Sequence, residues 1–341
     1  MRLQITSEFR KRLQLFTGAM LLLSVLAMPL PAANLMRGPY LQLGTPTSVV
    51  VRWRTDVATD SRVRYGLTPG SLTSTTDDLA STTEHQVALT GLTPNTRYYY
   101  SVGSTAATLS SGPDHTFVTS PATGTSKPTH IWVLGDSGTA NANVLAVRDA
   151  YQTLAGGRDT DLWLMLGDDA YNSGTDTEFQ AAVFAMFPEM LRKSVLWPTR
   201  GNHEATDASG SVYYNIFTMP KSAEAGGVAS GTEAYYSFNY GNIHFVCLDS
   251  YGSSRAVGSP MLTWLQNDLA ANTKDWIIAF WHHPPYSKGS HNSDTEAQLI
   301  DMRQNALPIL EAYGVDLVLG GTATPMSVLS CSTATMVFRP L

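Results

Sequence analysis

The stretch from 131 to 138, Ile-Trp-Val-Leu-Gly-Asp-Ser-Gly, decides the fold of the larger part of this 341-residue chain. Its four apolar residues predict a strand. The glycine that follows allows a sharp turn and a close approach of the backbone to a bound group. Asp136 therefore stands at the carboxyl end of a strand, where open α/β sheets bind their ligands.

Three further polar motifs follow strand-like runs in the same way. Gly-Asp-Asp-Ala-Tyr at 167–171 follows the apolar run 162–166, and His-His-Pro-Pro at 282–285 follows the run 276–281. Gly-Asn-His-Glu at 201–204 also follows a predicted strand. Each motif alone is typical of an ordinary turn. All four in one chain, each after a predicted strand, indicate a common site.

Between these motifs the sequence alternates strands with helices, which predicts a layered α/β domain over residues 129–321. Predicted strands cover 129–134, 162–166, 195–198, 235–238, 243–248, 276–281 and 315–319. Predicted helices cover 141–154, 177–191, 260–269 and 295–313. The glycine-containing stretch 205–233 is expected to be loop-like.

Residues 35–119 have a different pattern, in which short β-branched and aromatic runs are separated by Gly, Pro, Asn and Asp. Such a pattern predicts an all-β sandwich, with Trp53 as its core tryptophan. The segment 92–100 is similar to the E–F corner of fibronectin type III domains. Residues 120–128 have the composition of a linker. Predicted strands of the sandwich cover 49–54, 61–66, 85–89 and 97–102.

The N-terminus carries an export pattern. Arg10, Lys11 and Arg12 precede the apolar run 13–30, and small residues follow that run. This order predicts a secretory signal in residues 1–33. The alternative is an uncleaved anchor, because the run approaches the ~17 residues that a spanning helix needs. We expect a secreted, extracellular or periplasmic protein, which is held at a membrane only if this segment is uncleaved.

Composition narrows the class of partner. The chain has 22 Lys and Arg against 28 Asp and Glu, a net charge of −6. An acidic protein is not expected to hold nucleic acid by bulk charge. Two cysteines, Cys247 and Cys331, do not establish a disulfide. Because Cys247 lies in an apolar run, we expect it to be a buried free thiol.

The four motifs share the chemistry of hard and borderline metal ligands, namely carboxylate, phenolate, amide oxygen and imidazole. This mixed set suits Fe, Mn or Zn better than a metal that prefers thiolate.

In the motifs GDSG, GDDAY, GNHE and HHPP, the sequence from about Met36 to Gly321 resembles the calcineurin-like metallophosphoesterases. The tyrosine of GDDAY and the preceding sandwich resemble the purple acid phosphatase branch. The resemblance implies hydrolysis of phosphate esters by a hydroxide that two metals activate, with Fe(III) beside Zn, Mn or Fe(II). It also implies a phosphorylated small molecule or another phosphoester as substrate.

The resemblance assigns a ligand role to five residues. Asp136 and Tyr171 would bind the first metal, a ferric ion in the family. Asp168 would bridge the two metals. Asn202 and His282 would bind the second metal.

Other residues have different expected roles. His203 would contact the phosphoryl oxygens or protonate the leaving group, and His291 is a further candidate for contact with substrate. Asp169 is the alternative to its neighbour as bridging ligand, and His283 is the alternative imidazole. The family spacing favours the residues named above. His244, inside a predicted strand, is expected to be a packed histidine.

The sequence departs from the family pattern after the predicted strand 315–319. The family continues with Gly-His-x-His and then Tyr-Glu-Arg, whereas here Gly321 is followed by Thr322, Ala323 and Thr324. Each metal would lose one imidazole, so we expect impaired activity. Restoring one lost cytosine after codon 321 lets the shifted frame encode Gly-His-Ser-His-Thr-Tyr-Glu-Arg. Our hypothesis is that residues 322–341 are a frameshifted tail and that part of the fold is missing.

Three classes of function stay open. The leading one is phosphoester hydrolase, within which a phosphodiesterase or nucleotide pyrophosphatase is an alternative. The second is a non-catalytic secreted protein with a relic phosphoesterase domain, which the missing histidines favour. The third is a carbohydrate-binding protein, suggested by the aromatic residues of the sandwich. Metal analysis separates the first class from the other two.

Overall fold

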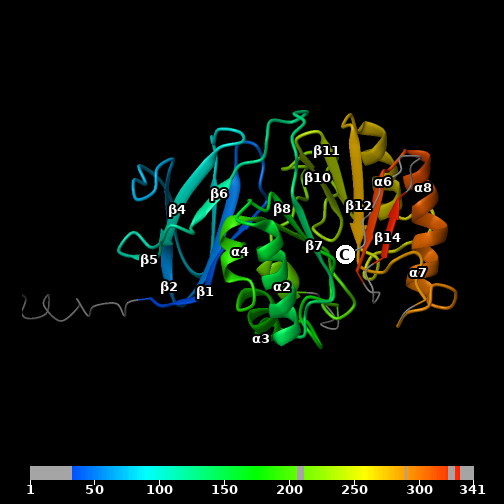
Figure 1. The fold of residues 1–341 in the computed structure, drawn as a ribbon, viewed down its shortest axis with the longest axis horizontal. Helices are drawn as coiled ribbons and strands as arrows, with labels where there is room; N and C mark the ends of the chain where they lie inside the picture. The colour runs from blue at the N-terminus through cyan, green and yellow to red at the C-terminus, as the bar shows by residue number, and fades with distance from the viewer. Residues whose placement is uncertain (1–32, 206–210, 289, 322–326, 331–341) are drawn as a thin grey trace, which may run out of the picture.

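The computed structural model describes residues 33–205, 211–288, 290–321 and 327–330. An N-terminal β-sandwich is followed by an α/β region, which confirms the predicted fold class (Figure 1). Almost all of the predicted signal and most of the predicted frameshifted tail lie outside the described residues. Within the described ranges, no helix has both the length and the apolar character needed to cross a membrane.

The sandwich is organised around one long central strand, β2, which pairs with β1, β3 and β4. Two strands, 49–54 and 61–66, were expected here, and that prediction is wrong. The pairing of β2 with β3 shifts register on either side of Thr59. Bulges at these shifts allow β2 to continue as one strand across the polar stretch 55–60. The strands are β1 (Leu35–Gln42), β2 (Val49–Gly66), β3 (Ser74–Leu89), β4 (Arg97–Gly103), β5 (Thr108–Ser110) and β6 (Thr116–Val118).

Trp53 is buried in the sandwich, as predicted, and its ring stacks on His85 with 4.7 Å between centroids. The His85 ring lies 2.8 Å from each of two hydroxyl oxygens, those of Thr55 and Ser61. These aromatic groups therefore serve the packing of the sandwich.

The first sheet of the α/β region has three parallel strands, β7 (Ile131–Leu134), β8 (Leu162–Met165) and β9 (Val195–Pro198). A parallel pairing of Leu41 with Val195 joins β9 to β1, so this sheet continues into the sandwich. Helices α2, α3 and α4 lie along one side of it in Figure 1. The helical segments are α2 (Ala142–Ala155), α3 (Asp176–Phe179), η1 (Gln180–Phe184) and α4 (Pro188–Lys193).

The second sheet has the order β10-β11-β12-β13-β14, with β11, β12 and β13 parallel. Helices α6, α7 and α8 lie on its outer side (Figure 1). Its strands are β10 (Tyr236–Tyr240), β11 (Ile243–Cys247), β12 (Trp276–Trp281), β13 (Leu317–Gly320) and β14 (Ser327–Ser330). Its helical segments are α6 (Pro260–Ala271), α7 (Ala297–Asp301), η2 (Met302–Ala306) and α8 (Leu307–Ala312).

Two helix predictions need correction. The expected helix 177–191 consists of α3, η1 and α4, and it is interrupted before Pro188 because the residue before a proline disfavours helical geometry. The expected helix 295–313 contains the π-helical segment η2 just before Pro308. Proline has no N–H to donate, which favours such a local rearrangement. A short helix, α5 (Ser211–Ile216), lies in the stretch that was expected to be loop.

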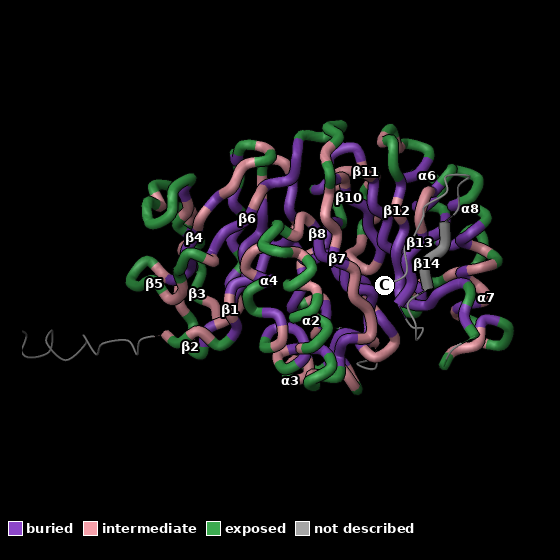
Figure 2. The backbone as a smooth tube through the Cα atoms, in the orientation of Figure 1, coloured by how far each residue is buried: buried purple, intermediate pink, exposed green. Residues whose placement is uncertain are grey.

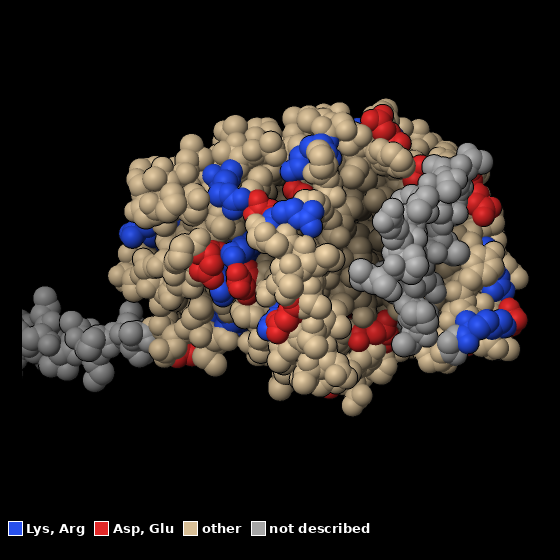
Figure 3. All heavy atoms as spheres, in the orientation of Figure 1, with Lys and Arg blue, Asp and Glu red and all other residues tan. Residues whose placement is uncertain are grey.

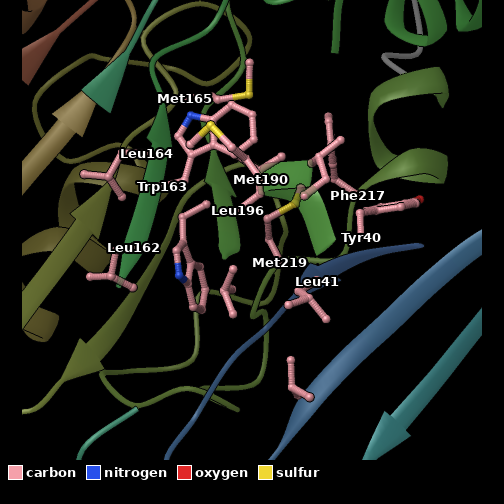
Figure 4. Packing of buried hydrophobic residues seen from close by; sticks show 14 of the residues in the cluster. Tyr40, Leu41, Leu162, Trp163, Leu164, Met165, Met190, Leu196, Phe217 and Met219 are labelled. Carbon is pink, nitrogen blue, oxygen red and sulfur yellow. The ribbon is translucent and has the colours of Figure 1, made fainter. Parts of the chain in front are cut away.

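The main hydrophobic core runs from the sandwich into the α/β region without a break. Tyr40 and Leu41 of β1 belong to the same buried cluster as Trp163 of β8 and Met190 of α4 (Figure 4). Buried residues follow the strands, and exposed residues lie on the outer helices and loops (Figure 2). Among the residues that the structure describes, Cys247 is a buried free thiol, as predicted. On the face drawn in Figure 3, basic and acidic side chains are interspersed.

Candidate metal centre

The carboxyl ends of β7, β8 and β12 bring together one residue from each of three motifs. Ligand atoms of Asp136, Asp168 and His282 lie within 4.8 Å of one another. Asp168 and His282 are buried, and Asp136 is partly buried. These residues are far apart in the chain and converge because parallel strands end at the same edge of their sheets.

Both aspartates sit on left-handed backbone, with φ of 55° at Asp136 and 56° at Asp168. Such a conformation is uncommon outside glycine and points to functional constraint at these turns. The neighbouring motif approaches closely, because a Cβ atom on Gly201 would lie 2.1 Å from Oδ1 of Asp168. Only glycine fits at position 201 without displacing that carboxylate.

His282 is oriented by the backbone. Its Nδ1 lies 2.9 Å from the carbonyl oxygen of Leu166, which can only accept, so Nδ1 carries the proton. Its Nε2 then faces two oxygens, Oδ1 of Asn202 at 3.2 Å and Oδ2 of Asp168 at 3.3 Å. An imidazole nitrogen and two oxygens aimed at one another fit a bound cation.

The structure separates His283 from this group. Its Nδ1 lies 2.9 Å from Oγ of Ser250, which also accepts the backbone N–H of His283 at 3.0 Å. Burial lowers the pKa of His283 to about 2. His282 therefore faces the group of ligand atoms, and its neighbour is held by Ser250.

Asp169 lies outside the three-residue ligand group. It is fully buried, and neither of its carboxylate oxygens has a hydrogen-bond partner among the described residues. Burial, followed by the negative charge of Glu204 and nearby aspartates, raises the pKa of Asp169 well above its ordinary value. A protonated Asp169 would be a poor metal ligand.

Tyr171 joins the group through Asp136. Its hydroxyl donates to Oδ1 of Asp136 at 3.1 Å. Burial and the charge of Asp136 raise the pKa of Tyr171 above its ordinary value. Burial also raises the pKa of Asp136. A phenolate at this position therefore requires a nearby cation.

His282 and Asp168 shift the pKa of each other in opposite directions. Burial alone would lower the pKa of His282, but the hydrogen bond and charge of Asp168 raise it to about 9. Burial alone would raise the pKa of Asp168, but the hydrogen bond and charge of His282 lower it below its ordinary value. A cation that replaced the imidazole proton would meet an already ionised carboxylate.

Of the two histidines expected to act on substrate, His203 contacts Asp168 of the ligand group. Its backbone N–H donates to Oδ1 of Asp168 at 3.1 Å, and its Nε2 lies 3.8 Å from Oδ2. Its ring stands edge-on to Tyr171, with 4.7 Å between centroids. His291 hydrogen-bonds to Glu296 at 2.7 Å and does not join the three-residue ligand group.

Glu204, to which sequence reasoning assigned no role, holds the second motif in place. Its buried carboxylate accepts the backbone N–H groups of Asp168, Asp169, Ala170 and Gly201 at 2.7 to 3.2 Å. The motif GNHE contains this residue, but side chain to backbone contacts between distant segments leave no sequence pattern. His244 is packed, as expected, and lies 2.8 Å from Asp268.

Gly321 brings the end of β13 to the ligand group. Its N–H donates to the carbonyl oxygen of His282 at 2.7 Å. A Cβ atom on Gly321 would lie 3.0 Å from Nδ1 of His282. Thr322 and Thr324, where the family pattern has histidines, follow immediately in the chain and lie outside the described residues.

Both regions of the chain match known protein families. Residues 36–119 match the family model for the purple acid phosphatase N-terminal domain, and residues 129–321 match the model for calcineurin-like phosphoesterases. Purple acid phosphatase 15 of Arabidopsis thaliana is 30% identical over 268 residues, which are 70% of this chain and 48% of that protein. Purple acid phosphatase 23 of the same plant is 26% identical over 340 residues, 82% of this chain and 71% of that protein.

Solved structures show the same fold. A purple acid phosphatase from yellow lupin seeds superposes with a TM-score of 0.68 at 18% identity, over 84% of this chain and 58% of that chain. The chain spans about half the length of the first of these curated relatives. With both family models matched in order along its length, the chain belongs to the calcineurin-like phosphoesterases, in the purple acid phosphatase branch.

Proposed function

We propose that this chain is built for metal-dependent hydrolysis of phosphate esters, of the acid phosphatase type. The observation that carries the proposal is the group of Asp136, Asp168 and His282, whose ligand atoms lie within 4.8 Å of one another. When bound, two metals would supply Lewis acidity for the phosphoryl oxygens and would lower the pKa of water. Fe(III) with Zn, Mn or Fe(II) suits these oxygen and nitrogen donors.

We assign each proposed ligand to one of two metals. Asp136 and Tyr171 would hold the first metal, since their oxygens are 3.1 Å apart. Asn202 and His282 would hold the second, since Oδ1 and Nε2 are 3.2 Å apart. Asp168 would bridge the two, because its ligand atom lies within 4.8 Å of those of both Asp136 and His282.

The remaining chemistry falls to the histidines. His203 has its Nδ1 beside the carbonyl oxygen of Asn172, so its Nε2 is the nitrogen that can exchange a proton with a substrate. In its protonated form it would donate to the leaving-group oxygen. His291, which is partly exposed and paired with Glu296, is the second candidate for contact with substrate.

Activity of this particular chain should be impaired. The chain leaves β13 beside His282. At the next two ligand positions of the family pattern, where the family has histidines, this chain has Thr322 and Thr324. A threonine hydroxyl is a poor substitute for imidazole. Loss even of outer-shell partners costs about 10–100-fold in metal affinity, and loss of direct ligands should cost more.

A frameshift after codon 321 would account for this departure. Sequencing of the gene across that codon, from independent isolates, tests the hypothesis. We expect a cytosine that restores the codons for Gly-His-Ser-His. An uninterrupted frame that encodes Thr322-Ala323-Thr324 in every isolate would refute it.

Export through the N-terminal segment is proposed on the basis of its basic and apolar regions. The expected product is found outside the cytoplasm, and mass spectrometry of its N-terminus should show cleavage near Ala33. An intact N-terminus on a membrane-bound product would favour the anchor. A full-length product in the cytoplasm would contradict export.

Metal analysis and hydrolysis of p-nitrophenyl phosphate test the main proposal. We expect the purified chain to bind Zn²⁺ or Mn²⁺ weakly and to hydrolyse slowly, and Asp168→Asn to remove both properties. Unchanged metal binding in Asp168→Asn would contradict the site. High activity of the unmodified chain would contradict the impairment, and no metal binding at all would favour the relic interpretation.

A further inference from the structure

The short helix α3 connects the sandwich to the candidate centre. Asp176, at its start, pairs with Arg37 of β1 at 3.0 Å and with Arg54 of β2 at 2.7 Å. Arg37 is fully buried, also binds Gln180 at 2.8 Å, and lies 4.0 Å over the ring of Phe184. A buried cation with these contacts fixes α3 and η1 to the sandwich, because removing one partner would leave a charge uncompensated.

Glu178 connects α3 to the turn that precedes it in the chain. Its carboxylate forms a capping box with Thr175, whose backbone N–H it accepts at 2.9 Å. The same carboxylate accepts the N–H groups of Asn172 at 2.6 Å and Ser173 at 3.2 Å. These bonds hold the turn 172–175, which follows directly on Tyr171.

The turn 172–175 contacts His203 through the carbonyl group of Asn172. The carbonyl oxygen of Asn172 lies 2.6 Å from Nδ1 of His203. A carbonyl oxygen can only accept, so this short contact selects the tautomer with the proton on Nδ1. It leaves Nε2 on the side of Asp168, at 3.8 Å from Oδ2.

We propose that Glu178 is a positioning residue that fixes the tautomer of His203, and that the sandwich supports it through Arg37 and Asp176. The chain of contacts runs from a buried arginine of the sandwich to the histidine that faces the ligand group. The relevance of this positioning role to catalysis rests on the proposed function. The tautomer of His203 does not depend on that function. The N-terminal sandwich is therefore part of the scaffold of the site.

Histidine side-chain NMR on the full, metal-free chain tests this inference. Two-bond ¹H–¹⁵N correlations distinguish the two neutral tautomers at about pH 8.5, and His203→Gln assigns the signal. We expect the Nδ1–H form in the unmodified chain. Glu178→Gln keeps the side-chain shape but places an amide group against backbone donors. It should shift the tautomer ratio about fivefold toward Nε2–H, as loss of one hydrogen bond predicts.

Two matched variants provide controls. Glu189→Gln removes an exposed acid that pairs with Lys193 on α4, and it should leave the His203 signal unchanged. Arg37→Met should shift the ratio in the same direction as Glu178→Gln. Arg97→Met breaks a different ion pair between the sandwich and the α/β region, with Asp159, and should not shift it.

The outcomes separate this inference from the proposed function. An unchanged tautomer ratio in Glu178→Gln would overturn the positioning role, whatever the metal binding. A shift in Glu178→Gln without one in Arg37→Met would overturn the contribution of the sandwich. A chain that binds no metal but shows both shifts would refute the proposed function and leave this inference intact.

Discussion

Gly201 shows at the scale of single residues how tightly two motifs meet. An added Cβ would lie 2.1 Å from Oδ1 of Asp168, which leaves no room for a methyl group. Gly201→Ala should displace the carboxylate and weaken Zn²⁺ or Mn²⁺ binding by about 10–100-fold, the size of effect seen when ligand support is lost. Isothermal titration calorimetry measures this change.

Gly38→Ala is the matched control, because an added Cβ there has no atom within 4 Å. This variant should bind metal as the unmodified chain does. Equal binding by both alanine variants would show that position 201 does not constrain the ligand.

His85 gives the sandwich a predicted pH dependence. Burial lowers the pKa of His85 to about 4, below the ordinary value of 6.5. Between these values the unfolded chain binds a proton that the folded chain does not, so stability falls as the pH falls from 6.5 to 4. From about pH 6.5 to about pH 5 this histidine should lower the free energy of unfolding by about 1.5 kcal/mol.

His85→Gln removes the titrating group. Urea unfolding at several pH values should show a flatter dependence for this variant over the same window, even if its stability near neutral pH is lower. Identical slopes in the two proteins would contradict the account of His85.

The sequence could predict which residues form the candidate group but not how they are held. Asp136, Asp168 and His282 stand in short motifs after apolar runs, so strand ends predict their convergence. The support comes from Glu204 and from backbone carbonyls such as that of Leu166. Those contacts depend on the register and approach of distant segments, which no local pattern encodes.

At the scale of elements, α2 depends on the residue that precedes its first turn. Oδ1 of Asn141 accepts the backbone N–H groups of Asn143 at 3.0 Å and Val144 at 3.3 Å. Asn141→Ala should lower the free energy of unfolding by about 1 kcal/mol, because it removes an N-cap. Chemical denaturation measures the loss.

Asn143→Ala tests whether the loss of stability is specific to the N-cap position. This residue lies inside the same helix, where alanine is the better helix former, so its replacement should be neutral or slightly stabilising. An equal loss in both variants would contradict the capping role of Asn141.

Elements that follow simple periodicity were predictable. The runs 195–198 and 276–281 coincide with β9 and β12 because apolar residues fill them from end to end. The interruption before Pro188 and the long bulged strand β2 were missed. In each case, contacts with distant segments decide whether a local irregularity ends the element.

At the scale of the whole molecule, the sandwich and the α/β region share a sheet and a core. Leu41 pairs with Val195, and both belong to one buried cluster. Two regions joined in this way should unfold together. Differential scanning calorimetry of the full chain should therefore show one transition, and two well-separated transitions would contradict the shared core.

The end of β13 leads the chain to the candidate metal centre. Gly321, which directly follows β13, donates its N–H to the carbonyl oxygen of His282, and the chain then continues into the positions that are histidines in the family pattern. Replacing both threonines in one variant, Thr322→His with Thr324→His, restores the missing imidazoles without altering the described ligands. Adding Asp168→Asn to this variant supplies a control that keeps the new histidines.

Metal content together with turnover of p-nitrophenyl phosphate in these variants is the decisive measurement for a metallophosphoesterase site that lacks two imidazoles. We predict that the two histidines raise both metal content and turnover by at least about 10-fold over the unmodified chain. We also predict that Asp168→Asn abolishes the gain. A gain that survives Asp168→Asn, or a metal-loaded histidine variant with no turnover, would contradict the proposed site.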